Sequence, residues 1–311
     1  MCLISGLSNV SPDFLLAAPR MKKSDLLLRA NMPTIGDGKC AKEQVVRSVD
    51  FFETHPVFRH GEFLAAHTAR GRSASTSNNL LAKHLAAGRL TRVRRGLYAT
   101  VPRGVDPKKA AVDPYLIITN LTDDAAVAYH AALQFHGKVY SVWRRFHYLT
   151  CKRARPNSFR GMEFVPVQTP SALRSRLNRG GGVSETRHAG GRVRVTTLER
   201  TLVDVLDKPE KSGGWEEIWR SLEMVEFFDL DAVIKYALAL GSSLTAARVG
   251  LFLEQHREPL MVDQKHLEAL HSHAPTQPRY LDGSRESGKL VPRWNLVVPE
   301  YVLRRGWEEA G

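Results

Sequence analysis

The sequence predicts an α+β protein, with a small helical unit near its N-terminal end and a larger part of mixed helices and strands after it. Three observations lead to this fold class. Helical and strand-like hydrophobic periods both recur along the chain. Within residues 41–102 the period changes from helical to strand-like, and a run with two prolines and a glycine follows. At 311 residues, the chain is also longer than one hydrophobic core usually serves.

We therefore divide the chain into four segments. Residues 1–40 are expected to be a disordered leader, 41–102 the helical unit, 103–111 a linker and 112–311 a mixed α/β C-terminal domain. The leader shows no sustained period, and prolines with a Gly-Asp-Gly cluster interrupt it. A translation start placed too far upstream is the other explanation for this segment.

Composition argues against several classes of protein. No run of about 18 apolar residues occurs, so we expect no membrane span. Residues 1–10 lack the basic segment of a signal peptide. The three cysteines are odd in number and far apart, which indicates a reducing compartment without disulfides or a zinc site. These features predict a cytoplasmic protein.

The net charge of +13 is unevenly distributed. Residues 1–105 hold 16 Lys/Arg and 7 Asp/Glu, and residues 106–194 hold 15 and 6. Residues 195–311 hold 14 and 19, so the last third of the chain is acidic. The stretch from Arg59 to Arg95 is the most basic, with eight Lys/Arg and one Glu. Such a compact basic unit is typical of proteins that bind nucleic acid.

The basic stretch belongs to a recognisable series of elements. The expected order is helix, strand, helix, turn, helix and hairpin, over residues 41–54, Val57–Arg59, 61–68, 69–74, 75–87 and 90–101. Ser75 or Thr76 is a good N-cap for the third helix, and Gly88 is placed to end it. The hairpin alternates on both sides of Arg94-Arg95-Gly96. This order is that of a winged helix-turn-helix, in which the hairpin is the wing.

We expect double-stranded DNA as the partner of this unit. Asn and Lys side chains on the third helix suit base edges in the major groove, Ser77 at its start suits a phosphate, and wing arginines suit phosphates or a narrow minor groove. The alternatives are a solvated helix face and a hairpin charged for solubility. The candidate DNA contacts are Arg70, Arg72, Ser77, Asn78, Asn79, Lys83, Arg92, Arg94 and Arg95.

The larger part alternates helices and strands. Its expected helices are one beginning at Asp113-Pro114, one capped at Thr196 and ended by Pro209, and others over 123–136, 215–227, 230–240, 243–255 and 263–270. Its expected strands are 146–151, 163–167, 192–195, 279–281 and 294–298. Thr196 and Glu199 have the spacing of a capping box, and Arg200 with Asp204 has the spacing of a helical ion pair.

Two motifs resemble a known family. Leu85–Tyr98 (LAAGRLTRVRRGLY) is similar to the helix-to-wing junction of the AbiE-type antitoxins of type IV toxin–antitoxin systems. Val195–Leu206 (VTTLERTLVDVL), with Pro209 and Gly213-Gly214-Trp215 after it, resembles the signature of that family's C-terminal domain. The likeness runs from about Gln44 to Val298 and leaves out the leader.

The resemblance implies a bacterial cytoplasmic protein with two roles. The winged helix would repress its own operon by binding repeats in the promoter. The C-terminal domain would counter a nucleotidyltransferase-like toxin without forming a stable complex with it. Glu199, Arg200 and Asp204 are the polar residues of the signature, and the likeness gives them a candidate antitoxin role beside their capping and pairing roles.

A second basic cluster lies in the C-terminal part. It consists of Arg144, Arg145, Lys152, Arg153, Arg155 and Arg160, with no acid between them. It would extend the DNA footprint or contact RNA or the toxin. A solvated strand edge protected by charge explains it equally well.

Enzyme chemistry has little support in the sequence. The chain has no P-loop, no G-x-S-x-G, no H-E-x-x-H and no paired Cys motif. His266, His271 and His273 lack the spacing of a metal site, so we expect no metal and no cofactor. An autorepressing antitoxin is the leading hypothesis. The alternatives are a stand-alone winged-helix regulator, whose C-terminal domain senses a ligand or dimerises, and a nuclease with an unrecognised site.

Overall fold

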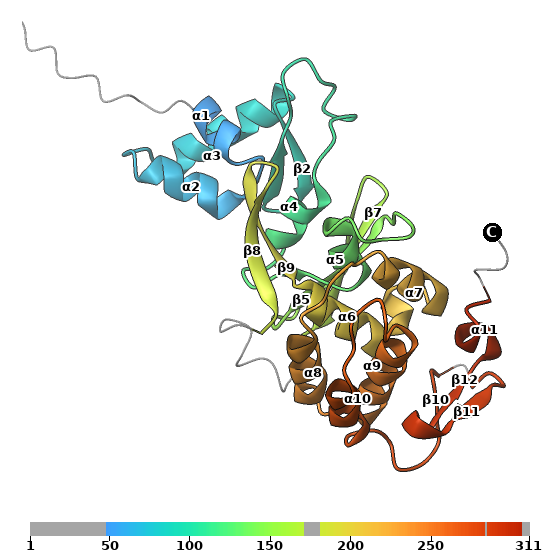
Figure 1. Cartoon of the computed structure of the whole chain (residues 1–311). Helices are drawn as coiled ribbons and strands as arrows, with labels where there is room; N and C mark the ends of the chain where they lie inside the picture. The colour runs from blue at the N-terminus through green and yellow to red at the C-terminus, as the bar shows by residue number, and fades with distance from the viewer. Residues whose placement is uncertain (1–47, 171–180, 284, 307–311) are drawn as a thin grey trace, which may run out of the picture. The chain divides into compact units, whose positions relative to one another are not determined.

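The computed structural model describes residues 48–170, 181–283 and 285–306, and shows a mixed α+β fold (Figure 1). The predicted leader and the first part of the predicted helix 41–54 lie outside these residues. Within the described ranges, no helix combines the length and apolar character that crossing a bilayer requires.

The N-terminal unit has the predicted order of elements. Its three-stranded antiparallel sheet has the order β1-β3-β2, and Phe58, Phe63 and Tyr98 are among the residues buried between the sheet and the helices. The elements are α1 Ser48–Thr54, β1 Val57–Arg59, α2 His60–Thr68, α3 Ala74–Ala86, β2 Leu90–Arg94 and β3 Leu97–Thr100.

Helix α3 begins slightly earlier than predicted. Its N-cap is Ser73, whose hydroxyl accepts a hydrogen bond from the Thr76 N–H, so the expectation of Ser75 or Thr76 was wrong. The helix ends as expected before Gly88, which has φ +68°. A Cβ at Gly88 would lie 2.7 Å from Cγ of Pro107, so glycine meets both the backbone conformation and the close contact.

The middle of the chain forms a six-stranded mixed sheet. The strand order is β6-β7-β5-β4-β9-β8, and helices α4 Pro114–Thr119 and α5 His130–Phe135 pack beside it. The strands are β4 Ala126–Val127, β5 Arg145–Thr150, β6 Asn157–Phe159, β7 Met162–Gln168, β8 Val183–His188 and β9 Gly191–Thr196.

The predicted helix 123–136 was partly wrong. Ala126 and Val127 form β4, which pairs with β5 on one side and β9 on the other. The run from Ala125 to Ala128 is fully buried, and a short buried strand has the same apolar pattern as a buried helix. Only the second half of the predicted helix is helical, as α5.

One apolar cluster joins the N-terminal unit to this sheet. Val93 and Leu97 of the hairpin and Val57 of β1 pack with Leu116 to Ile118 of α4 and with Val127 and Val193 of the sheet. The hairpin is therefore held on the middle of the chain by buried contacts. The connection 101–113 contains no helix or strand, and Ala110 within it is buried.

The rest of the described chain is mainly helical. Trp219 and Trp294 are fully buried in its core. The helices are α6 Leu198–Asp207, η2 Pro209–Lys211, α7 Trp215–Glu223, α8 Leu230–Ala239, α9 Ser243–Gln255, α10 Gln264–His271, η3 Pro292–Trp294 and α11 Glu300–Leu303. A small sheet has the order β10-β12-β11, with strands Arg279–Tyr280, Leu296–Val298 and Lys289–Val291.

Helix α6 carries a buried ion pair. Arg200 Nε donates to Asp204 Oδ2 at 3.1 Å, and the hydroxyl of Tyr236 donates to Asp204 Oδ1 at 2.7 Å. Burial raises the pKa of Asp204, and the neighbouring guanidinium opposes that shift. The helix is capped by Thr197 and not by a Thr196–Glu199 box, because Thr196 ends β9 and its hydroxyl contacts Thr201.

Breaking this buried pair should strongly destabilise the fold. Asp204→Ala leaves the Arg200 charge buried without its partner, so we expect the free energy of unfolding to fall by about 3–5 kcal/mol. Glu216→Ala is the control, since its ion pair with Arg220 lies at the surface and its loss should cost at most about 1 kcal/mol. Urea unfolding followed by circular dichroism measures both, and equal losses would contradict the buried role.

Candidate nucleic-acid interface

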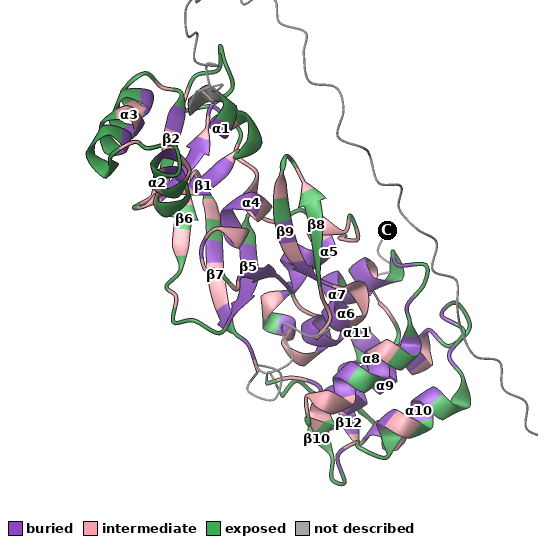
Figure 2. Cartoon of the chain, turned by 90° about the vertical axis from the view of Figure 1, so that its left-hand side faces the viewer, coloured by how far each residue is buried: buried purple, intermediate pink, exposed green. Residues whose placement is uncertain are grey.

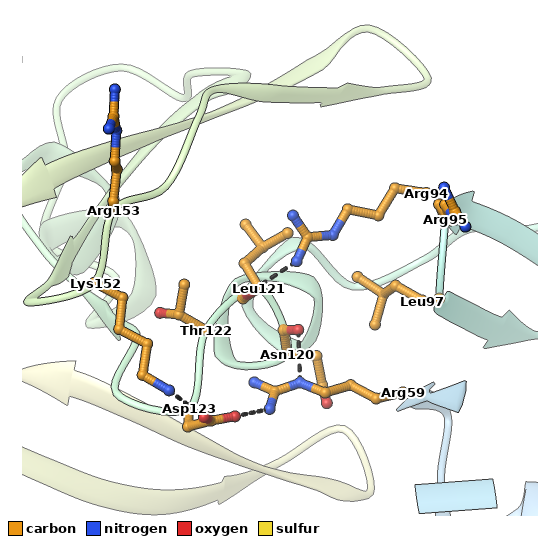
Figure 3. Close-up of a pocket in the computed structure, with 11 residues that line it drawn as sticks. Arg59, Arg94, Arg95, Leu97, Asn120, Leu121, Thr122, Asp123, Lys152 and Arg153 are labelled. Atoms are coloured by element: carbon orange, nitrogen blue, oxygen red, sulfur yellow. Dashed lines mark hydrogen bonds and ion pairs between the residues drawn. The ribbon is translucent and has the colours of Figure 1, made fainter. Parts of the chain in front are cut away.

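A basic groove lies at the tip of the β2–β3 hairpin (Figure 3). It has a volume of about 280 Å³. Its walls come from the hairpin turn, the end of β1, the loop between α4 and β4, and the loop after β5. The groove is lined by Arg59, Arg94, Arg95, Gly96, Leu97, Asn120, Leu121, Thr122, Asp123, Lys152 and Arg153.

The charge of the groove is strongly positive. Five of its lining side chains are Arg or Lys, and Asp123 is the single acid among them. Asp123 forms ion pairs with both Arg59 and Lys152. Hydrogen bonds from Lys152 and Arg59 hold the pKa of the Asp123 carboxyl below its usual value. The carboxylate therefore stays ionised and links the N-terminal unit to the loop after β5.

The two hairpin arginines differ in their surroundings. Arg94 is half-buried, and its Nη2 donates to the carbonyl oxygen of Leu121 at 2.7 Å. Arg95 is exposed, as is Arg153 across the groove, and neither has an ion pair within the described residues. Part of the Arg94 guanidinium therefore holds the α4–β4 loop, a contact that the sequence did not indicate. Arg95 and Arg153 remain available to an anion.

Helix α3, in the same N-terminal unit as the hairpin, has an exposed polar face. Asn78 and Lys83 are exposed, as predicted, and Asn79, which was expected near the boundary of this face, is exposed too. His60 Nε2 lies 2.8 Å from Asn78 Oδ1, which orients that amide. Ser77 was expected to be exposed, but it is fully buried. Its hydroxyl donates to the Ser73 carbonyl at 3.0 Å. Ser77 lies four residues before the buried Leu81, so both belong to the inward face of the helix.

The remaining predicted contacts surround this face. Arg70 and Arg92 are exposed, and the Arg92 guanidinium lies 6.0 Å from the centre of the Tyr98 ring. Arg72 is half-buried, with Nη1 at 3.3 Å from Nδ1 of His67. Burial, together with the charge of Arg72, lowers the pKa of His67. Arg72 therefore helps to hold the turn between α2 and α3.

The second basic cluster divides into two groups. Lys152 and Arg153 line the groove, and Arg155 is exposed beyond them. Arg145 instead pairs with Glu163 at 2.9 Å, and Arg144 donates to the Arg160 carbonyl at 2.9 Å. The strand-edge explanation is wrong for β5, because this strand lies between β7 and β4 within the sheet.

Several groove residues were not predicted as site residues, and three of them carry charged or amide side chains. Arg59 comes from β1, and Asn120 and Asp123 come from the loop before β4. Arg59 Nε donates to the Asn120 carbonyl at 2.9 Å. The sequence signal for Arg59 was its place at the start of the basic stretch. Asp123 carried no such signal, since it was assigned to a helix.

The signature residues lie apart from the groove. Arg200 and Asp204 are buried in the ion pair on α6, and Glu199 is partly exposed on the same helix. His266 lies 3.5 Å from Asp231, and no group of three or more His, Cys, Asp or Glu side chains suited to a metal occurs among the described residues.

Comparison with known proteins gives one informative likeness. No family model matches the chain, and no curated protein matches it. Among solved structures, the chain is similar to the crystal structure of the RV2827C protein from Mycobacterium tuberculosis, with a TM-score of 0.56 and 17% identity. The match covers 85% of this chain and 94% of that chain. At this identity the likeness shows a shared fold.

The charge of the groove gives a direct test with a generic polyanion. Asp123→Asn removes its single acid, so the full-length variant should elute from heparin at higher salt than the unaltered chain. Arg153→Ala should elute earlier. Arg257→Ala is the matched control, because this exposed arginine is not among the residues that line the groove. Equal shifts for Arg153→Ala and Arg257→Ala would show that net charge alone governs retention.

Proposed function

We propose that this chain is a double-stranded DNA-binding transcription regulator, and that residues 48–102 act as a winged helix-turn-helix. The observation that carries this proposal is the combination of an exposed polar helix and a basic hairpin tip on one unit, with a basic groove beside that tip. Helix α3 takes the place of the recognition helix, and the β2–β3 hairpin takes the place of the wing.

In this proposal, α3 contacts the base edges and so recognises the DNA sequence. The side chains of Asn78, Asn79 and Lys83 are exposed on this helix. An asparagine amide can pair with two atoms of an adenine edge, and a lysine can donate to guanine or to phosphate. The hydrogen bond from His60 reduces the freedom of the Asn78 amide before DNA arrives, which lowers the entropic cost of a directed contact.

Backbone binding is assigned to the hairpin and the groove. Arg95 and Arg153 are exposed cations on two sides of one cavity. Contacts from such residues to phosphates fix the position of a protein on a duplex and make its affinity depend on salt. The groove thus supports a footprint that continues from the N-terminal unit to the loop after β5.

The antitoxin role is proposed from the resemblance of the two motifs alone. In this proposal the protein acts in the bacterial cytoplasm, represses its own operon at promoter repeats, and counters a nucleotidyltransferase-like toxin without a stable complex. The burial of Arg200 and Asp204 bears on the mechanism, because these side chains are not free to contact a partner. Glu199 and the surface around α6 are the remaining candidates.

A stand-alone regulator is the alternative, and one cavity favours it. A cleft of about 810 Å³ lies between residues 53–57 and the tip of the β8–β9 hairpin, with Arg187, His188 and Leu116 among its lining residues. This volume suits a small ligand. A ligand bound there would contact both the N-terminal unit and the central sheet.

The proposed readout predicts different effects for helix and hairpin variants. Arg95→Ala should weaken binding to all duplexes and reduce the slope of log K against log salt by about one contact. Asn78→Ala should instead reduce the difference in affinity between operator and unrelated DNA. Fluorescence anisotropy with the DNA upstream of the gene measures both, with Arg257→Ala as the control. An unchanged slope for Arg95→Ala would remove the hairpin tip from the interface.

The antitoxin proposal has its own test in cells. Expression of this chain should restore the growth of cells that express a nucleotidyltransferase-like toxin encoded beside it. Arg95→Ala should keep this rescue while it weakens repression, since the two roles use different surfaces. An isolated gene and no rescue, together with a small ligand that raises the melting temperature, would favour the stand-alone regulator.

A further inference from the structure

Strand β8 leaves one edge of the central sheet open. Among the described residues, β8 pairs with β9 alone and ends the strand order β6-β7-β5-β4-β9-β8. Residues 184–187 are exposed, and Figure 2 shows the strand green over this length. An exposed edge presents unpaired N–H and C=O groups, which can pair with another strand.

The hydrogen-bond pattern of the β8–β9 hairpin determines which peptide groups of β8 face the open edge of the sheet. The Thr197 N–H donates to the Gly182 carbonyl at 2.9 Å, and a two-residue turn follows the pair His188–Gly191. Hydrogen-bonded pairs alternate along an antiparallel ladder. The peptide groups of residues 182, 184, 186 and 188 therefore face β9. Those of Glu185 and Arg187 face the open edge.

The side chains at this edge carry an unbalanced charge. Glu185 and Arg187 lie on the same face of the strand, two residues apart. Arg192 Nη1 donates to Glu185 Oε1 at 3.0 Å. Arg187 lies directly opposite Arg192, and within the described residues it has no ion pair of its own. Like charges opposite each other are unfavourable, so Arg187 would gain from an added carboxylate.

A second copy of β8 supplies that carboxylate in one antiparallel register. A residue whose peptide group faces the open edge must lie opposite another such residue in the second copy, which limits the possible registers. Placing Thr186 opposite Thr186 puts Glu185 of each copy opposite Arg187 of the other. The adjacent registers put Glu185 against Glu185 or Arg187 against Arg187. Charge therefore selects the register that is symmetric about Thr186.

We propose that the chain self-associates through β8, with a second copy related by a two-fold axis at Thr186. The two central sheets then form one continuous sheet, with antiparallel pairing of the two β8 strands at the axis, and two symmetric Glu185–Arg187 ion pairs close the interface. This proposal does not depend on DNA binding. If both hold, the dimer presents two α3 helices related by the same two-fold symmetry, which suits an inverted pair of half-sites.

The test uses the full-length chain and sedimentation velocity over a range of concentrations up to about 100 μM, where weak dimers are populated. The unaltered chain should show a reversible dimer. Arg187→Glu places two Glu–Glu pairs at the interface and should raise the dissociation constant by roughly tenfold or more. Arg155→Glu makes the same charge change away from β8 and should leave the constant unaltered. A monomer at every concentration would overturn the proposal.

Exchanging the charges at positions 185 and 187 distinguishes a loss of dimerisation caused by like charges from one caused by misfolding. The double variant Glu185→Arg/Arg187→Glu restores opposite charges across the axis and should dimerise as the unaltered chain does. A mixture of Glu185→Arg and Arg187→Glu chains should form heterodimers in preference to either homodimer. The circular dichroism spectra of all variants should match that of the unaltered chain. Failure of both the double variant and the mixture to recover dimerisation would exclude the Glu185–Arg187 register.

Discussion

The arrangement of the molecule depends on the apolar contact between the N-terminal unit and helix α4. Val57, Val93 and Leu97 lie in one buried cluster with Leu116 and Ile117. Burial of large aliphatic side chains contributes about 1.5–3 kcal/mol for each of them, more than the surface ion pairs of the groove can supply. The hairpin tip can lie beside the α4–β4 loop because this apolar contact holds the two elements together.

Polar contacts then define the geometry at the rim of that cluster. Arg94 and Arg59 donate to the carbonyl oxygens of Leu121 and Asn120, and Asp123 is held between Arg59 and Lys152. These arginines have a structural use, and it limits how far they can move toward a ligand. Arg95 and Arg153 carry no such restraint within the described residues. The same groove therefore contains cations that hold its shape and exposed cations without such contacts.

Local patterns predicted the N-terminal unit well. The end of α3 and the hairpin lay within a residue or two of the predicted ones, because Gly88 and Gly96 mark real turns with φ +68° and +77°. The hydrophobic pattern was less informative for strands that are not half-buried. Strand β8 is exposed at its four central residues, so it lacks the apolar alternation that identifies a strand. Strand β4 is short and wholly buried, so its residues looked helical.

The candidate site was predicted in pieces that the sequence could not join. The hairpin arginines and the basic cluster near Lys152 were each recognised from charge, yet some 60 residues separate them in the chain. Their meeting depends on β5 pairing with β4, a long-range contact that local pattern does not encode. Asp123 stayed unrecognised for the same reason, since its role exists only once Arg59 and Lys152 are brought to it.

The second motif that carries the family resemblance, Val195–Leu206, is mostly buried, which affects what it can say about function. In Val195–Leu206, the apolar residues fill the core, Thr197 caps α6, and Arg200 pairs with Asp204 inside the fold. Such residues constrain how the chain packs, and a protein with a different partner could use the same packing. The function proposed for this chain is assigned to exposed groups such as Asn79, Lys83 and Arg95, where packing demands little. For Val195–Leu206, likeness of sequence therefore bears on the fold more than on the function.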